Sequence, residues 1–169
     1  MKNIALVGMS GCGKTTVGQA VAGLCNMEFY DADAEIECVE RMTISEIFER
    51  YGEAYFRDLE RKAIAALAKR DNTVISTGGG AVLDKRNIGA LKKTSVIVFL
   101  DRDIDEITAG LDTSNRPLAK NKERFLRLYD ERIGLYKNFG DITVKNAGSI
   151  DSVAKNIIEG VRDFENSDN

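Results

Sequence analysis

Histidine is absent from this sequence of 169 residues, and proline occurs once. The lack of histidine excludes imidazole acid–base catalysis, a Ser-His-Asp triad and every metal site that depends on histidine. Any chemistry must therefore use carboxylates, lysine, arginine, hydroxyl groups and backbone amides. The three cysteines, Cys12, Cys25 and Cys38, lack the close pairing of a zinc or redox motif. We interpret them as small apolar residues in a reducing compartment.

The chain also lacks an excess of positive charge and long apolar runs. Its net charge is −3, so we expect neither nucleic acid nor an anionic membrane as a partner. Apolar runs such as Ser95–Leu100 are too short to span a bilayer. The apolar stretch that follows Met1 ends in a glycine loop instead of a small-residue cleavage site, so we expect no signal peptide and a cytoplasmic location. No apolar stripe is left over for an interface, and we expect a monomer.

Short apolar strands alternate with longer amphipathic stretches, an order typical of α/β architecture. The first and fourth strands are continuous apolar runs, as expected when helices cover both faces of a parallel sheet. We therefore predict one domain over residues 1–169, with a three-layer α/β/α fold around a five-stranded parallel sheet. The predicted strands are Asn3–Val7, Glu28–Tyr30, Thr73–Ser76, Ser95–Leu100 and Asp141–Val144. The predicted helices are Lys14–Leu24, Ala34–Glu40, Ile44–Glu49, Glu53–Lys69, Lys85–Leu91, Arg102–Ala109, Lys122–Asn138 and Asp151–Phe164.

One segment, Gly110–Asn121, differs from the rest of the chain. It contains turn-forming residues, charges and the single proline, Pro117. A polar loop of this length inside a compact domain is more often functional than a simple connection. We therefore predict that it has a functional role.

A glycine-rich loop carries the clearest chemical signal in the sequence. Gly8–Thr15 fits the pattern G-x-x-x-x-G-K-[ST], follows an apolar strand and opens a helical pattern. Glycines allow backbone N–H groups to point at a polyphosphate, and the helix N-terminus adds a favourable dipole. Lys14 is then expected to reach the β- and γ-phosphates of ATP, and the Thr15 hydroxyl to bind Mg²⁺. The expected nucleotide-binding residues of this P-loop are Gly11, Cys12, Gly13, Lys14, Thr15 and Thr16.

Cys12 occupies a free position of the motif. We expect its thiol to lie near the bound phosphates. Alkylation of Cys12 should then slow ATP binding, and MgATP should protect the thiol.

Two acidic residues, Asp31 and Asp33, follow the second predicted strand, at the edge where α/β sheets place ligand-binding groups. Carboxylates at i and i+2 on a strand end face the same side. One could organise the water shell of Mg²⁺ while the other orients or deprotonates an attacking hydroxyl. Asp33 is equally suited to be a helix N-cap, because a helical pattern follows it. Both interpretations stay open at this point.

Two further patterns have a functional and a simpler interpretation. Arg57 and Glu60 are three positions apart on a predicted helix, where they can form an ion pair that fixes the guanidinium, or an ordinary surface pair. Three consecutive glycines, Gly78–Gly80, follow the third strand. Such a run is costly in chain entropy, so it indicates close approach of the backbone to a ligand. A flexible turn is the alternative.

Together these residues resemble the shikimate kinase family, within the nucleoside monophosphate kinase-like group of P-loop proteins. The resemblance runs from the first strand to about Tyr136, and the last strand and helix match in layout only. Each mark is modest alone, but their order and spacing are specific. Besides the P-loop, the marks are Asp31-Ala32-Asp33, Gly52-Glu53, Phe56-Arg57 with Glu60, Gly78-Gly79-Gly80-Ala81, Arg116-Pro117-Leu118, and Arg132 with Leu135-Tyr136.

The resemblance implies transfer of the γ-phosphoryl group of MgATP to the 3-hydroxyl of shikimate, in the aromatic amino-acid (chorismate) pathway. It implies a mobile lid over about residues 111–122, whose Arg116 swings in to meet the phosphates beside Lys14. Asp31 would support Mg²⁺ through its water shell, next to Thr15. The implied catalytic residues are Lys14, Asp33 and Arg116.

The resemblance further places the acceptor on a helical segment of about residues 33–60. Asp33 would bind the shikimate hydroxyls and would be the base, while two arginines would grip the carboxylate. Planar guanidinium groups suit that anion independently of any resemblance. The implied substrate-binding residues are Asp33, Arg57, Gly79, Gly80 and Arg132.

The chain departs from the family pattern in its P-loop filling, Met9-Ser10-Gly11-Cys12, in a short lid with fifteen residues between Arg116 and Arg132, and at two single positions. Ala119 stands where members usually have leucine, and Ala109 stands near the place where some carry an arginine that packs on adenine. ATP preference over other nucleotides could therefore be weak. The rival hypotheses are another small-molecule kinase, such as a gluconate or nucleoside monophosphate kinase, and a nucleotide-binding module without catalysis. The intact residues Lys14, Asp33 and Arg116 argue against the last.

Overall fold

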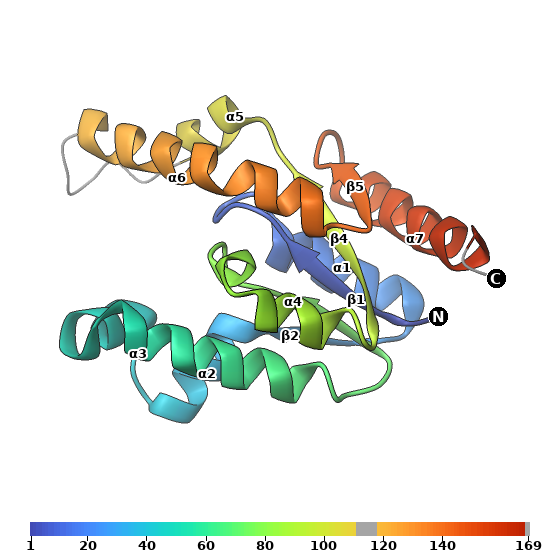
Figure 1. Ribbon diagram of the computed structural model, residues 1–169. Coiled ribbons are helices and arrows are strands. Elements are labelled where there is room, and N and C mark those ends of the chain that lie inside the picture. Colours follow the sequence, from blue (N-terminus) through green and yellow to red (C-terminus); the bar gives the residue numbers. More distant parts are fainter. Residues whose placement is uncertain (111–117, 168–169) are drawn as a thin grey trace.

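The computed structural model describes residues 1–110 and 118–167, and for residues 118–121 it describes the backbone alone. Arg116 and the central part of the predicted lid therefore lie outside the described residues. The described part contains a five-stranded sheet in the order β2-β3-β1-β4-β5, with all neighbouring strands parallel (Figure 1). The strands are β1 (Asn3–Val7), β2 (Glu28–Asp31), β3 (Thr73–Ser76), β4 (Ser95–Asp101) and β5 (Ile142–Lys145). The predicted parallel five-stranded sheet is confirmed.

Helices cover both faces of the sheet, since successive parallel strands are joined by right-handed crossovers. Helix α1 packs beside α7, and α3 packs beside α4, which makes the outer layers of the fold (Figure 1). The helices are α1 (Lys14–Cys25), α2 (Ala32–Glu40), α3 (Ile44–Leu67), α4 (Lys85–Leu91), α5 (Ile104–Ala109), α6 (Leu118–Phe139) and α7 (Ile150–Ser167), with a 3₁₀ turn, η1, at Ala81–Leu83. The 3₁₀ turn was not predicted.

Two helix boundaries differ from the prediction for a physical reason. Helix α2 begins at Ala32, two residues early, because the side chain of Asp31 caps it. The two helices predicted on either side of Gly52 form the single element α3, with a break at Gly52, whose φ of 80° and ψ of 175° are not helical. Helix α3 begins at Ile44 as predicted, and Thr43 and Glu46 exchange hydrogen bonds there in a capping box.

Apolar side chains form two clusters. The main core lies between the sheet and its helices and includes residues 4–7 of β1. A second, smaller cluster of Ile36, Ile47 and Phe56 joins α2 to α3 away from that core. Within the described ranges, no helix is both long and apolar enough to cross a membrane.

Candidate active site

The polar groups that matter for function meet at the carboxyl edge of the sheet. The P-loop follows β1, Asp31 ends β2, the glycine run Gly78–Gly80 lies just after β3, and Arg102 follows β4. In open parallel sheets this edge is where ligands bind. The topology therefore gathers residues from four separate parts of the sequence into one place.

The P-loop takes its shape from glycines and from one asparagine. Gly11 and Gly13 have φ values of 79° and 99°, a left-handed backbone that favours glycine. Asn146, just after β5, donates from Nδ2 to the Cys12 carbonyl oxygen at 2.7 Å. A Cβ on Gly13 would collide with that amide. Asn146 thus fixes the loop immediately before α1, whose N-terminal N–H groups suit an anion.

Lys14 and Thr15 open α1 and point in different directions. Lys14 is buried, and its Nζ donates to the carbonyl oxygens of Gly8 and Met9, each at 2.8 Å. Thr15 is exposed, and its Oγ1 donates to Asp31 Oδ2 at 2.9 Å. The P-loop hydroxyl and the β2 carboxylate are therefore already side by side, where a phosphate-bound cation would need them.

These residues line a cavity of about 480 Å³, a size typical of small-molecule sites. We call it the nucleotide cavity. Its lining residues are Ser10, Gly11, Gly13, Lys14, Thr15, Thr16, Asp31, Asp33, Ser76, Thr77, Gly78, Gly79 and Arg102.

Cys12 is missing from that lining. Its side chain is 1% exposed and belongs to the main core, and its Sγ lies 3.8 Å from Lys14 Nζ. The thiol thus lies beneath the loop and not on the cavity surface. The backbone N–H of Cys12 donates to the Met9 carbonyl oxygen at 3.2 Å, and its carbonyl oxygen accepts from Asn146.

The two aspartates have different roles in the structure. Asp31 Oδ1 accepts from the backbone N–H groups of Asp33 at 3.0 Å and Ala34 at 3.3 Å, so Asp31, not Asp33, is the N-cap. The expectation that both lie on one strand end is wrong, because Asp33 already belongs to the first turn of α2. This leaves the Asp33 side chain free of capping. Its Oδ1 is buried and has no hydrogen-bond partner in the described part of the chain.

The electrostatic surroundings of Asp33 disfavour its charged form. Burial raises the pKa of Asp33, and the negative charge of Asp31 raises it further. Lys14 and Arg57 lower the pKa of Asp33 without cancelling the shift. A carboxylate with a raised pKa and an open oxygen is suited to accept a proton or a hydroxyl hydrogen bond.

A second cavity, of about 280 Å³, adjoins the first, and we call it the acceptor cavity. Arg57 Nη1 donates to Glu60 Oε2 at 2.8 Å, and Arg57 Nη2 to Glu53 Oε1 at 3.3 Å. Glu60 is 0% exposed, so the simple surface pair is ruled out. Burial raises the pKa of Glu60, and the Arg57 guanidinium opposes that shift. The buried carboxylate thereby holds the guanidinium at the cavity wall.

The three glycines pack against the functional side chains of both cavities. A Cβ on Gly78 would lie 2.9 Å from Asp33 Oδ1, and one on Gly80 would overlap the Arg57 guanidinium. A Cβ on Gly79 would lie 3.6 Å from Arg132 Nη1, which α6 brings to the same spot. The run is therefore a close-packed wall, and the flexible-turn alternative is not supported.

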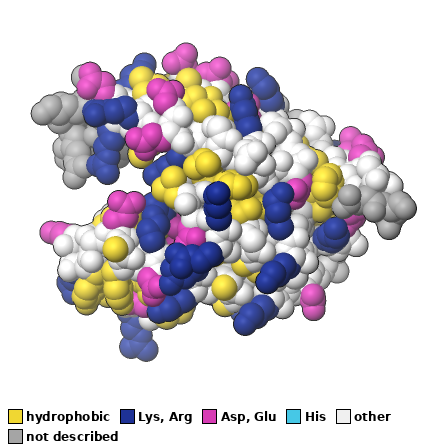
Figure 2. Space-filling view, in the orientation of Figure 1, with side chains coloured by type: hydrophobic (Ala, Val, Ile, Leu, Met, Phe, Trp, Pro, Cys, Tyr) yellow, Lys and Arg dark blue, Asp and Glu magenta, His cyan; other side chains and the backbone are white. Residues whose placement is uncertain are grey.

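The two cavities share part of their walls. Figure 2 shows the molecule hollowed between the lobe with α6 and the lobe with α2 and α3. The residues that line both cavities are Ser10, Asp33, Gly78 and Gly79. Asp33 thus stands at the boundary, where a group bound in one cavity meets a group bound in the other.

Every predicted site residue other than Arg116 and Cys12 lines one of these two cavities. Sequence reasoning missed several residues that line or support them: Ser10, Ile44, Phe48, Thr77, Arg102, Arg124, Leu128 and Asn146. Three of these follow a strand directly, and that position was the signal available for Thr77, Arg102 and Asn146.

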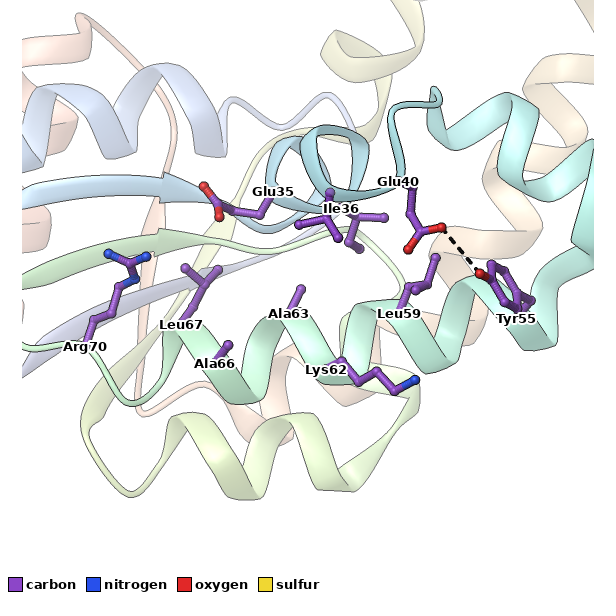
Figure 3. A pocket seen from close by; sticks show the side chains of 11 residues that line it. Glu35, Ile36, Glu40, Tyr55, Leu59, Lys62, Ala63, Ala66, Leu67 and Arg70 are labelled. Atoms are coloured by element: carbon purple, nitrogen blue, oxygen red, sulfur yellow. Dashed lines mark hydrogen bonds between the residues drawn. The ribbon is translucent and has the colours of Figure 1, made fainter.

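A third cavity, of about 430 Å³, lies between α2 and α3 (Figure 3). Its apolar walls come from α2 and α3, with Ile36, Leu59 and Leu67 among them. The hydroxyl of Tyr55 donates to Glu40 Oε2 at 3.3 Å across one end. None of the predicted site residues lines it.

Comparison with known proteins gives a consistent result. The family model described as "Shikimate kinase" matches residues 10–162. A shikimate kinase of Clostridium botulinum (strain Eklund 17B / Type B) is 45% identical over 159 residues, which is 93% of this chain and 96% of that protein. The structure of a shikimate kinase from Acinetobacter baumannii in complex with shikimate superposes with a TM-score of 0.89 and 34% identity, covering 96% of this chain and 94% of that one.

A gluconokinase from Sinorhizobium meliloti 1021 also has a similar structure, with a TM-score of 0.63 at 19% identity, covering 98% of this chain and 94% of that one. Identity this low indicates a shared fold and nothing about the acceptor.

Proposed function

The chain belongs to the shikimate kinase family, and from this premise we propose that it transfers the γ-phosphoryl group of ATP to the 3-hydroxyl of shikimate. One observation of the molecule supports this most directly. A carboxylate, Asp33, stands on the shared wall between a P-loop cavity and a smaller cavity lined by three arginines, Arg57, Arg124 and Arg132. The products are shikimate 3-phosphate and ADP.

The acceptor cavity has the groups that a small hydroxylated acid requires. Arg57 and Arg132 offer guanidinium forks for a carboxylate. The Arg132 Nε is buried and has no hydrogen-bond partner among the residues that the structure describes. Asp33 Oδ1 is open in the same way and can accept from a ring hydroxyl. The backbone of Gly79 and Gly80 completes the wall.

The nucleotide cavity suits a magnesium polyphosphate. The helix N-terminus and the P-loop amides receive the phosphates, and Lys14 can exchange its bonds with two loop carbonyls for phosphate oxygens. Thr15 and Asp31, which are hydrogen-bonded to each other, fit a Mg²⁺ held by phosphate, hydroxyl and water. In the described ranges no group of three or more Asp, Glu, Cys or His side chains is arranged so that it could hold a metal ion.

The chain's own residues then supply alignment and charge. Arg57 and Arg132 would hold the acceptor by its carboxylate, so that a hydroxyl faces the shared wall. Asp33 would accept the proton of that hydroxyl as it attacks. Lys14 would neutralise charge on the transferred group, and Arg116, on the lid of about residues 111–122, would join it.

We further propose that the protein acts as a monomer in the cytoplasm, without a nucleic-acid or membrane partner. The net charge of −3 is consistent with that proposal. A gluconate kinase is the alternative function, and the family assignment together with the arginines of the acceptor cavity favours shikimate.

The test is ADP formation by the purified protein with MgATP and a panel of acceptors. We expect turnover with shikimate, and phosphorus NMR of the product should place the new ester on the 3-hydroxyl. Turnover with gluconate or a nucleoside monophosphate in place of shikimate would refute the proposed acceptor. ADP release that no acceptor stimulates would favour a nucleotide-binding module.

A further inference from the structure

Tyr136 is a fully buried residue of α6 whose hydroxyl reaches the glycine wall. The side chain is 0% exposed, and its ring stacks on Phe99 of β4 with centroids 5.3 Å apart and an interplanar angle of 16°. The hydroxyl donates to the Gly79 carbonyl oxygen and lies 3.5 Å from Met9 Sδ. One oxygen of an α6 side chain thus contacts both the P-loop and the loop after β3.

The carbonyl oxygen that accepts from Tyr136 belongs to Gly79, a residue of the wall that the two cavities share. Gly79 lines both cavities, and a Cβ there would lie 2.7 Å from Ser10 Oγ and 3.0 Å from Ser10 N. In a planar trans peptide the C=O and the following N–H point in opposite directions. With its C=O fixed on Tyr136, the peptide must direct the Gly80 N–H away from that hydroxyl.

The hydroxyl is a permanent donor. Burial raises the pKa of Tyr136 to about 12, although the neighbouring Arg132 guanidinium lowers it. The phenol therefore stays protonated over the range in which a carboxylate base works. The hydrogen bond from Tyr136 to Gly79 can therefore fix the position of the Gly79 carbonyl without adding a pH dependence to catalysis.

We propose that Tyr136 is a positioning residue for phosphoryl transfer. Its hydroxyl fixes the Gly79–Gly80 peptide, and this peptide sets how the acceptor faces the nucleotide across the shared wall. Tyr136 and Arg132 are one turn apart on α6, so the same helix places both the wall and an acceptor-binding arginine. The role of Tyr136 in phosphoryl transfer rests on the proposed function, whereas its role in fixing the Gly79–Gly80 peptide does not.

The test compares Tyr136→Phe with Tyr129→Phe. The first removes only the hydroxyl and keeps the ring on Phe99. The second removes the hydroxyl of Tyr129, a partly buried tyrosine of α6 that has no hydrogen bond to either cavity wall in the described part of the chain. We expect Tyr136→Phe to lower kcat/KM for shikimate about threefold to tenfold, as for loss of one buried hydrogen bond. Its affinity for a fluorescent ADP analogue should stay within about twofold. Tyr129→Phe should match the wild type in both.

Hydrogen exchange gives a readout that needs no turnover. In Tyr136→Phe the amides of residues 77–82 should exchange faster than in the wild type, while those of β1 and α7 keep their rates. If the wild type shows no shikimate-dependent ADP formation, the proposed function fails, and this exchange pattern alone decides on Tyr136. Unchanged exchange at 77–82, or equal losses of nucleotide and acceptor affinity together with general destabilisation, would overturn the positioning role.

Discussion

The Arg57 guanidinium occupies the space that a side chain on Gly80 would need. The backbone of Gly80, with φ −94° and ψ 0°, is open to any residue, so the restriction comes from the arginine and not from the turn. Arg57 is in turn held by Glu60 at 2.8 Å. The Glu60 carboxylate thus packs against the Arg57 guanidinium, which packs against the backbone of Gly80 at the wall of the acceptor cavity.

Gly80→Ala should therefore displace Arg57 and weaken shikimate binding about tenfold or more, since charge-assisted hydrogen bonds to the acid are lost. Nucleotide affinity should be retained. Isothermal titration with shikimate and with MgADP measures both. Gly89→Ala on α4 is the matched control, because nothing lies within 4 Å of a Cβ there. It should stabilise the protein by about 0.5–1 kcal/mol and leave both affinities intact.

Arg57→Ala should raise KM for shikimate about 10- to 100-fold with little change in KM for ATP. It should also lower the melting temperature, because Glu60 then stays buried without its cation. Steady-state kinetics with each substrate varied and a thermal melt measure these effects. Arg61→Ala, four residues along the same helix, removes a partly exposed ion pair with Asp58 and should change neither KM. Equal rises in both Michaelis constants for Arg57→Ala would mean that the pair with Glu60 is purely structural.

Asp33→Asn should lower kcat about 10²- to 10⁴-fold, the usual contribution of a general base. The affinity for MgADP should change little, because Asp33 lines the boundary and makes no bond to the P-loop. Single-turnover kinetics with saturating ATP and shikimate separate chemistry from product release. Near-normal turnover would remove Asp33 from the base role and leave it as an orienting residue.

Asp31→Asn should shift the acid limb of the pH profile of kcat/KM for shikimate. Burial and, after it, the charge of Asp31 raise the pKa of Asp33. The base works when ionised, so activity is lost as the pH falls through that pKa. Removing the Asp31 charge lowers the pKa of Asp33, and the limb should move to lower pH. Asparagine also caps helices, so α2 should persist. If the acid limb of the profile does not move, it reports the titration of a group other than Asp33.

Alkylation should discriminate among the three cysteines. Cys38 is exposed, Cys25 is partly buried and Cys12 is buried beneath the P-loop. Burial also raises the pKa of the Cys25 thiol, which lowers its reactivity. We expect iodoacetamide to label Cys38 first and Cys12 last, and MgATP to slow the Cys12 reaction further. Mass spectrometry of tryptic peptides follows the order. Fast labelling of Cys12 in the free protein would contradict its placement in the core.

Sequence patterns predicted the sheet because β1 and β4 are continuous apolar runs apart from polar residues at their ends. They misjudged the start of α2, since the chain passes from β2 into the helix without a loop and Asp31 belongs to both. The burial of Glu60 was out of reach, because it depends on the distant glycine run that covers it. The role of Asn146 was equally hidden, since its partner, the Cys12 carbonyl, is 134 residues away.

The small apolar cluster of Ile36, Ile47 and Phe56 has a consequence for how this architecture can diversify. It supports the segment that contributes Ile44, Phe48 and Arg57 to the acceptor cavity, whereas the P-loop rests on the main core. Substitutions in one cluster need not propagate to the other, because the two do not share apolar neighbours. Selection could therefore reshape the choice of acceptor through a handful of side chains under α2 and α3, while the machinery for the triphosphate is inherited unchanged.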